Sequence, residues 1–321
     1  MSLTSILVST HLYKKKSLLL GMHHFPFINI ENKSYPSVIM GEDRFTGWFG
    51  KKLFNTEKQR EIAYKDSIET AYDCGVRGFS MSPHPTLIKV LKNFKKEHPE
   101  IVCISNHHWQ THYYLGKKSL WTKENMERLA STEKYYLNQK VIENSSWFKG
   151  LDVNKRFSEE ELKTIRLDEK EYVEQLKEFR AFCDFCLVGN LGRSALITIG
   201  REDIVQREID LARKIGFIPL GMCEGGGSAL PKMEKLNVSG HWVWINRHHA
   251  HPNLQYALKV IKKIKKPITA YKIFTSPEGF NFKESIKFIK SVPQIKSIVV
   301  GVENKEQAKE TFSNLREYFK S

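Results

Sequence analysis

The sequence predicts an α/β protein whose core is a single (β/α)8 TIM barrel. Short continuous apolar runs recur along most of the chain, and segments with helical apolar spacing follow them. Such runs are typical of parallel strands buried on both faces. Their count, eight, favours a closed barrel over an open doubly wound sheet. Several runs are followed at once by histidines, so we expect these side chains to gather at one end of the barrel.

The predicted strands share an apolar centre and a polar or glycine-rich exit. In chain order they are SVIMGED at 37–43, VRGFSMS at 76–82, IVCISNHH at 101–108, FCDFCLVGN at 182–190, FIPLGMCEGGG at 217–227, HWVWINRHH at 241–249, PITAYKIF at 267–274 and IKSIVVGV at 295–302. Helices are expected between them. The clearest are KQREIAYKDSIETAYDCG and REDIVQREIDLARKIG, and each of these ends at a glycine.

The chain length fits one large domain. We expect residues 1–36 to form an irregular N-terminal extension and residues 37–321 to form the barrel. One connection is much longer than the others, and a structureless loop of that length is rare in a compact domain. Residues 109–167 are therefore predicted to be a helical insertion between the third and fourth strands. It leaves from the mouth of the barrel, so it is either a lid over the site or a surface or oligomer contact.

The formal charge of +15 has two interpretations. It attracts anionic partners, and we expect a small anionic or phosphorylated substrate. It also reflects lysines spread over helix faces along the whole chain. The sequence contains no aromatic-basic RNA motif and no zinc-finger spacing, so nucleic-acid binding has no support. The sequence also leaves open whether the chain forms a homo-oligomer.

Cysteine usage and hydropathy indicate a cytoplasmic protein. The five cysteines are an odd number and lie mostly in or beside predicted buried strands, as reduced thiols do. Cys183 and Cys186 form a C-x-x-C, but strand geometry turns their side chains to opposite faces, which argues against a redox or metal pair. Three lysines interrupt the N-terminal apolar stretch, so it is a poor secretory signal, and no segment is long enough to span a membrane.

The exit of the first strand contributes Asp43 and Arg44. Asp43 is a candidate general base or metal ligand, and Arg44 can bind a carboxylate or phosphate through paired hydrogen bonds. The alternative is an ion pair between the two that shapes the loop. The exit of the fifth strand brings Glu224 into three glycines, where the backbone can approach a ligand closely. Glu224 is the strongest acid candidate, and the alternative is a cap or turn residue.

Two pairs of adjacent histidines follow the third and sixth strands, His107 with His108 and His248 with His249. One imidazole from each pair would join Glu224 in a set that suits zinc, manganese or iron; we assign His108, His249 and Glu224 as the metal candidates. The alternative is acid–base chemistry without metal, with His107 and His248 as catalytic groups.

The remaining candidates lie at other strand exits. His84 and Arg247 are expected to contact the substrate or its phosphate, and His251, before a proline, is expected in a loop or cap. Lys272 ends the seventh strand and is a candidate catalytic cation or base.

The turn after the eighth strand, with Gly301, Asn304 and Lys305, opens a helix. Barrels often bind a phosphate at this place. The alternative is a purely structural turn.

These strand sequences resemble the aldo-keto reductases. ITAYKIF is similar to that family's seventh strand, and IKSIVVGVENKEQAKETF to its eighth strand and following helix, which in the family bind the phosphates of NADP. CDFCLVG resembles the fourth strand, and AYDCGVRGFSMS lies where the family has its opening unit. The resemblance implies a TIM barrel and NADP as cofactor.

The catalytic tetrad of the family is not retained. Aligning the strands places Ser80 at the position of its aspartate, Pro85 near its tyrosine, Asn106 at its lysine and Gly189 at its histidine. Without the tyrosine–lysine pair, the usual proton donor for carbonyl reduction is absent.

Three functional hypotheses follow. The first is a barrel enzyme related to the reductases that uses histidine and glutamate in acid–base or metal-assisted chemistry, of hydrolase, lyase or isomerase type. The second is an NADP-dependent oxidoreductase with relocated catalytic groups. The third is a binding protein without catalysis. The first is preferred, because ionisable residues are expected to converge from several strands.

Overall fold

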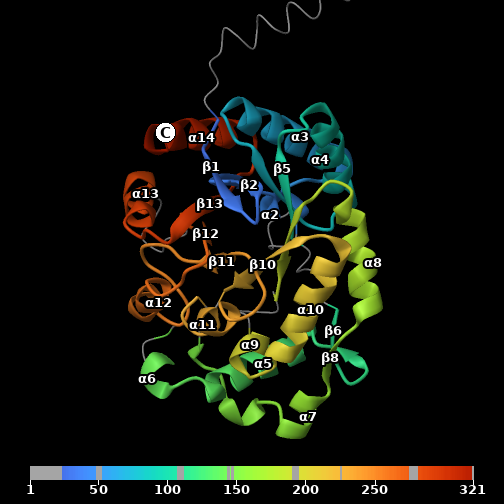
Figure 1. The fold of residues 1–321 in the computed structure, drawn as a ribbon, viewed down its shortest axis with the longest axis vertical. Coiled ribbons are helices and arrows are strands. Elements are labelled where there is room, and N and C mark those ends of the chain that lie inside the picture. The colour runs from blue at the N-terminus through green and yellow to red at the C-terminus, as the bar shows by residue number, and fades with distance from the viewer. Residues whose placement is uncertain are drawn as a thin grey trace, which may run out of the picture.

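A computed structural model describes residues 24–47, 53–106, 112–142, 145, 148–189, 195–224, 226–274 and 281–319. Within them, eight parallel strands close into a barrel and neighbour one another in chain order (Figure 1). They are β3 (Val38–Gly41), β4 (Gly78–Met81), β5 (Val102–Ser105), β9 (Phe185–Val188), β10 (Ile218–Cys223), β11 (His241–Trp244), β12 (Ile268–Tyr271) and β13 (Ile295–Gly301). Each lies in one of the predicted apolar runs, so the TIM-barrel prediction is confirmed.

Helices connect successive strands and cover the outside of the barrel. They are α2 (Asp43–Thr46) and α3 (Glu57–Asp73) after β3, α4 (Pro85–Glu97) after β4, α8 (Glu169–Arg180) before β9, α9 (Ala195–Thr198) and α10 (Glu202–Ile215) after β9, α11 (Leu230–Met233) after β10, α12 (Leu254–Ile261) after β11, α13 (Phe282–Lys290) after β12 and α14 (Lys305–Tyr318) after β13. Among the described residues, no helix is both long and apolar enough to cross a membrane.

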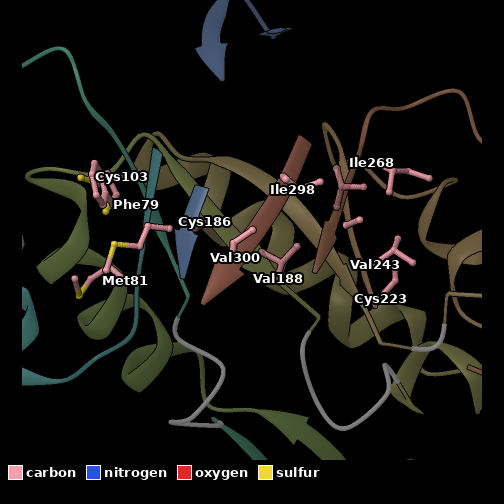
Figure 2. Close-up of a cluster of buried hydrophobic side chains, with 14 of the residues drawn as sticks. Phe79, Met81, Cys103, Cys186, Val188, Cys223, Val243, Ile268, Ile298 and Val300 are labelled. Atoms are coloured by element: carbon pink, nitrogen blue, oxygen red, sulfur yellow. The ribbon is translucent and has the colours of Figure 1, made fainter. Parts of the chain in front are cut away.

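Side chains of the barrel strands alternate between two hydrophobic clusters, as the pleat of a strand requires. One cluster, which includes Ile39 and Trp242, fills the inside of the barrel. It contains residues of the barrel strands and of the segment 27–36 that precedes them. The other, which includes Met40 and Val243, packs against the helices; Figure 2 shows part of it. This alternation decides which residues face the inside at each strand end.

A hairpin closes the amino-terminal end of the barrel. It consists of β1 (Phe27–Ile30) and β2 (Lys33–Pro36), paired antiparallel. The Tyr35 side chain is fully buried, and its hydroxyl lies 3.0 Å from Thr269 Oγ1 and accepts a hydrogen bond from Trp242 Nε1 at 2.8 Å. The prediction that residues 1–36 are irregular is therefore wrong for 27–36.

Close packing of this hairpin requires glycine at position 78. A Cβ there would overlap the Pro36 ring and lie 2.8 Å from Ile39 Cγ1. We expect Gly78→Ala to lower the free energy of unfolding by about 1–3 kcal/mol through overpacking, measured by urea denaturation. Gly301→Ala is the control, since its Cβ would meet only Arg44 Cγ, at 3.9 Å. Equal stability of the two variants would contradict the prediction.

The long connection between β5 and β9 contains strands as well as helices. Its elements are β6 (Tyr113–Leu115), β7 (Lys118–Ser119), α5 (Lys123–Tyr136), α6 (Gln139–Ile142), the 3-10 helix Val153–Lys155, α7 (Glu159–Lys163) and β8 (Ile165–Leu167). The three strands form a small antiparallel sheet in the order β7, β6, β8. This part of the chain lies at the opposite end of the barrel from the hairpin (Figure 1). Its role as a lid stays a hypothesis.

All five cysteines are buried and none forms a disulfide. Cys186 lies within β9, while Cys183 comes just before it. The burial raises the pKa of both thiols well above the ordinary value, so neither is activated as a thiolate.

Candidate active site

The inward-facing positions of the strands change from apolar to polar at their carboxyl ends. In β10, Leu220 and Met222 belong to the inner cluster, so the next inward position is Glu224. In β5, the same spacing places Asn106 two residues beyond the inner Ile104. Barrel enzymes have their catalytic groups at this end. The alternation therefore brings polar side chains from several strands to one mouth.

Glu42, directly after β3, is the buried centre of this mouth. Ser80 and Ser82 donate hydroxyl hydrogen bonds to its two carboxylate oxygens, and Asn106 forms a further side-chain hydrogen bond. Burial raises the pKa of Glu42 above its ordinary value despite these bonds. Glu42 is not among the candidates predicted from the sequence. Its polar neighbours at the next two strand exits were the signal that could have found it.

The residues aligned with the reductases' tetrad have other contacts in this structure. Two of them, Ser80 and Asn106, bind Glu42. Gly189 has a positive φ of 75°, its N–H donates to the buried Glu208 at 2.9 Å, and a Cβ would lie 2.8 Å from Met233 Cε. A histidine does not fit there without rearrangement. Pro85 is the first residue of α4.

Asp43 lies beside Glu42, and the pKa of its carboxyl is also raised. Burial, and next the charge of Glu42, raise the pKa of Asp43 to about 7, while the Lys272 ammonium opposes the shift. Glu224 and Arg44 act on the same carboxyl with smaller effects of opposite sign. Asp43 Oδ1 is buried and has no hydrogen-bond partner among the described residues. The structure therefore brings together three predicted candidates, Asp43, Glu224 and Lys272.

Lys272 is held in an unusual backbone conformation just after β12. Its φ is 55°, in the left-handed region that costs free energy for a residue with a Cβ. Asn246 Nδ2 donates a 3.1 Å hydrogen bond to the Lys272 carbonyl, and the Lys272 ammonium lies 4.0 Å from the centre of the Trp244 ring. These contacts fix the position of the cation at the mouth.

Tyr271 lies next to this cation. Its ring centre is 6.4 Å from that of Trp244, and its buried hydroxyl has no hydrogen-bond partner among the described residues. Burial, followed by the charges of Glu224 and other nearby acidic groups, raises the pKa of Tyr271 well above 10. The hydroxyl therefore stays protonated and can donate a hydrogen bond to a ligand.

Arg44 forms an ion pair with Glu303, with a distance of 2.5 Å between Nη2 and Oε1. This partner lies after β13, so the alternative in which Arg44 pairs with Asp43 is wrong. The reason is geometric, because β13 and β3 are neighbouring strands in the closed barrel. The pair places the guanidinium beside the turn that was predicted to bind phosphate.

This turn has an open backbone and positive charge. A Cβ at Gly301 would meet only Arg44 Cγ. Asn304 caps α14 by accepting from the backbone N–H of Gln307, and Lys305 lies 3.7 Å from Asp66 as a half-exposed ion pair. Space is therefore open beside Gly301, while Glu303 and Asp66 occupy the two cations Arg44 and Lys305. The turn therefore combines an uncrowded glycine with two cations, each of which pairs with a carboxylate.

The predicted convergence of histidines from the third and sixth strands stays a prediction. His107 and His108 lie outside the described residues. His84 precedes α4, and its Nε2 lies 3.0 Å from Arg60 Nη1; burial, together with this guanidinium, lowers the pKa of His84. It is therefore a neutral group that contacts Arg60.

His251 lies in the loop between β11 and α12, in agreement with the expectation of a loop residue, whereas the cap of α12 is Asn253. Its side chain is fully buried, and its Nε2 lies 3.1 Å from Glu133 Oε1 of α5. The long connection folds back over this loop, which sequence spacing alone does not show.

The metal hypothesis gains no support from the arrangement. Throughout the described ranges, no group of three or more histidine, cysteine, aspartate or glutamate side chains is placed to hold a metal ion. Of its three proposed ligands, Glu224 and His249 belong to no such group, and His108 is not described.

Comparisons with known proteins support the fold. No protein-family model matches the chain, and no curated protein matches it significantly. Two solved structures of proteins assigned as aldo-keto reductases from Pseudomonas aeruginosa are similar. One is 15% identical with a TM-score of 0.54, and the match covers 93% of this chain and 97% of that one. The other is 12% identical with a TM-score of 0.52, covering 93% and 98%. The chain thus has a TIM barrel of the aldo-keto reductase type.

Proposed function

We propose that this protein is a nicotinamide-dependent oxidoreductase that interconverts a carbonyl compound and an alcohol, with relocated catalytic groups. The observation that carries the proposal is the buried Asp43 carboxyl, with a pKa of about 7 and within the electrostatic influence of the Lys272 ammonium, at the mouth of an aldo-keto reductase-type barrel. The similarity of the fold to aldo-keto reductases favours the oxidoreductase hypothesis. No comparison supports hydrolase, lyase or isomerase chemistry.

The turn between β13 and α14 is the proposed dinucleotide site. A bound nicotinamide dinucleotide would supply or accept the hydride. Gly301, Asn304 and Lys305 would hold its phosphates, and Arg44 would contribute charge after it leaves Glu303.

The proton is assigned to Asp43. A carboxyl with a pKa of about 7 is protonated in a large fraction of molecules at neutral pH, and it can donate that proton to the oxygen of a carbonyl that is being reduced. The Lys272 ammonium would stabilise negative charge on that oxygen. The neighbouring Glu42 keeps the Asp43 proton in place, because two adjacent carboxylates do not both ionise readily. This arrangement replaces the lost tyrosine–lysine pair.

Dinucleotide binding tests the proposal. We expect NADPH or NADH to quench the intrinsic tryptophan fluorescence at micromolar concentrations and to be oxidised in the presence of a suitable carbonyl compound. Lys305→Gln should weaken the binding of the tighter dinucleotide by about tenfold, because it removes a charged phosphate contact. Lys92→Gln, an exposed change on α4, is the control. A folded protein that binds neither dinucleotide at millimolar concentration would refute the function, whereas binding without turnover of any carbonyl would favour the non-catalytic hypothesis.

A further inference from the structure

Several polar atoms at the mouth are buried without a hydrogen-bond partner among the described residues. They include Asp43 Oδ1 and Tyr271 Oη, and also Arg247 Nε and His248 Nε2. Buried polar atoms in folded proteins are nearly always hydrogen-bonded, so such atoms at one end of a barrel are suited to bind a ligand. Asp43 is assigned to proton transfer. Arg247 and His248 have no role in the proposed reaction so far.

Arg247 and His248 occupy the tip of a tightly fixed loop. The loop is closed by a bridge between Ile245 and Ala250, and Asn246 N–H donates to the His249 carbonyl at 2.9 Å. Asn246 Oδ1 accepts from the backbone N–H groups of His248 and His249, at 2.9 and 2.8 Å.

The same Asn246 fixes this loop to the end of β12, because its Nδ2 donates to the carbonyl of Lys272. One asparagine thus connects the backbone of His248 and His249 to the backbone of Lys272. Preorganised donors of this kind can bind a ligand without first paying the entropy of ordering a loop.

The charges of the mouth are arranged asymmetrically. Asp43 and Glu224 are carboxyl groups at the exits of β3 and β10, whereas Arg247 and Lys272 are cations at the exits of β11 and β12; Arg44, which also follows β3, is paired with Glu303. A substrate whose reacting carbonyl faces Asp43 and Lys272 would therefore present its other end to Arg247.

We infer that Arg247 and His248 bind a carboxylate of the substrate, and that the substrate is a small 2-oxo acid or the corresponding 2-hydroxy acid. The two nitrogens offer two N–H donors, with the His248 proton on Nε2, and a carboxylate has two oxygens to accept them. The adjacent 2-oxo group would lie toward Lys272. The identity of the reacting group rests on the proposed oxidoreductase function, whereas the carboxylate site rests on the geometry of the loop.

Oxamate, an unreactive analogue of a 2-oxo acid, is the probe. Isothermal titration calorimetry with the full-length protein, alone and with saturating NADH or NADPH, should detect oxamate binding and much weaker binding of oxamide, its neutral analogue. Arg247→Gln and His248→Gln should each weaken oxamate binding by about tenfold or more, because each removes a hydrogen bond to a charged group. Lys92→Gln should bind oxamate like the wild type, and thermal unfolding checks that every variant is folded.

Separate outcomes identify which inference fails. Equal binding of oxamate and oxamide, or oxamate binding unaffected by both substitutions, overturns the carboxylate site. Tighter binding of inorganic phosphate than of oxamate, lost in Arg247→Gln, also overturns it in favour of a phosphorylated substrate. Turnover of neutral aldehydes without oxamate binding keeps the oxidoreductase and rejects this substrate class. Oxamate binding that depends on Arg247, with no dinucleotide binding, keeps the anion site and rejects the oxidoreductase.

Discussion

Asp43→Asn is expected to lower kcat for carbonyl reduction by about 10²- to 10⁴-fold, the range that a positioned general acid contributes. The amide has nearly the same shape as the carboxyl but cannot transfer a proton at neutral pH. Steady-state kinetics with the best carbonyl substrate measure the effect, while dinucleotide affinity should change little. A variant with more than half of the wild-type kcat would show that Asp43 is not the proton donor.

The pH profile tests the same assignment independently. Because the acid must be protonated for reduction, kcat/KM of the wild type, which reports the groups of the enzyme before substrate binds, should fall as the pH rises above about 7, the pKa of Asp43. Alcohol oxidation needs the ionised carboxylate, so its rate should rise over the same interval. Asp43→Asn should lose this transition in both directions. Arg166→Gln, an exposed substitution in β8, should retain it and serves as the control.

Glu133→Ala is expected to have the largest effect on stability, a loss of about 3–5 kcal/mol in the free energy of unfolding. Glu133 on α5 and His251 are both fully buried, and Thr198 Oγ1 donates to the same Glu133 oxygen at 3.3 Å. The Phe148 ring lies against the His251 imidazole, with ring centres 5.0 Å apart. Removal of the carboxylate would leave His251 buried beside a cavity.

Urea denaturation of the wild type, Glu133→Ala and a control gives this difference. The control is Glu169→Ala, which removes an exposed carboxylate paired with Arg207 and should cost less than about 1 kcal/mol. Equal losses in the two variants would contradict a structural role for the buried contact. Confirmation would establish that α5 is fixed to the loop after β11, which limits how far this part of the long connection can move as a lid.

The barrel was predictable because its signal is local. Continuous apolar runs mark buried parallel strands, and helical spacing follows them. The hairpin at 27–36 was missed because its turn is made by Glu31 and Asn32 at positive φ, where glycine is the usual signal. The short strands of the long connection were missed because three residues are too few for a periodicity.

The site was predictable in part for a related reason. Asp43, Glu224 and Lys272 stand at strand exits, and the parallel barrel brings those exits together. Glu42 escaped notice because its importance comes from Ser80 and Ser82, which lie some 40 residues further along the chain. The buried contact of His251 could not be predicted, because its partner, Glu133, belongs to the long connection.

The sequence by itself determined the barrel and the end of it where chemistry takes place, since apolar periodicity and strand exits are properties of neighbouring residues. Only the tertiary structure decided the state of each group at that end. Burial and the proximity of Glu42 raise the pKa of Asp43, and the contact between β13 and β3 gives Arg44 its partner Glu303. These effects depend on distances between residues far apart in the chain, and a pKa or an ion pair is fixed by such distances rather than by the order of residues.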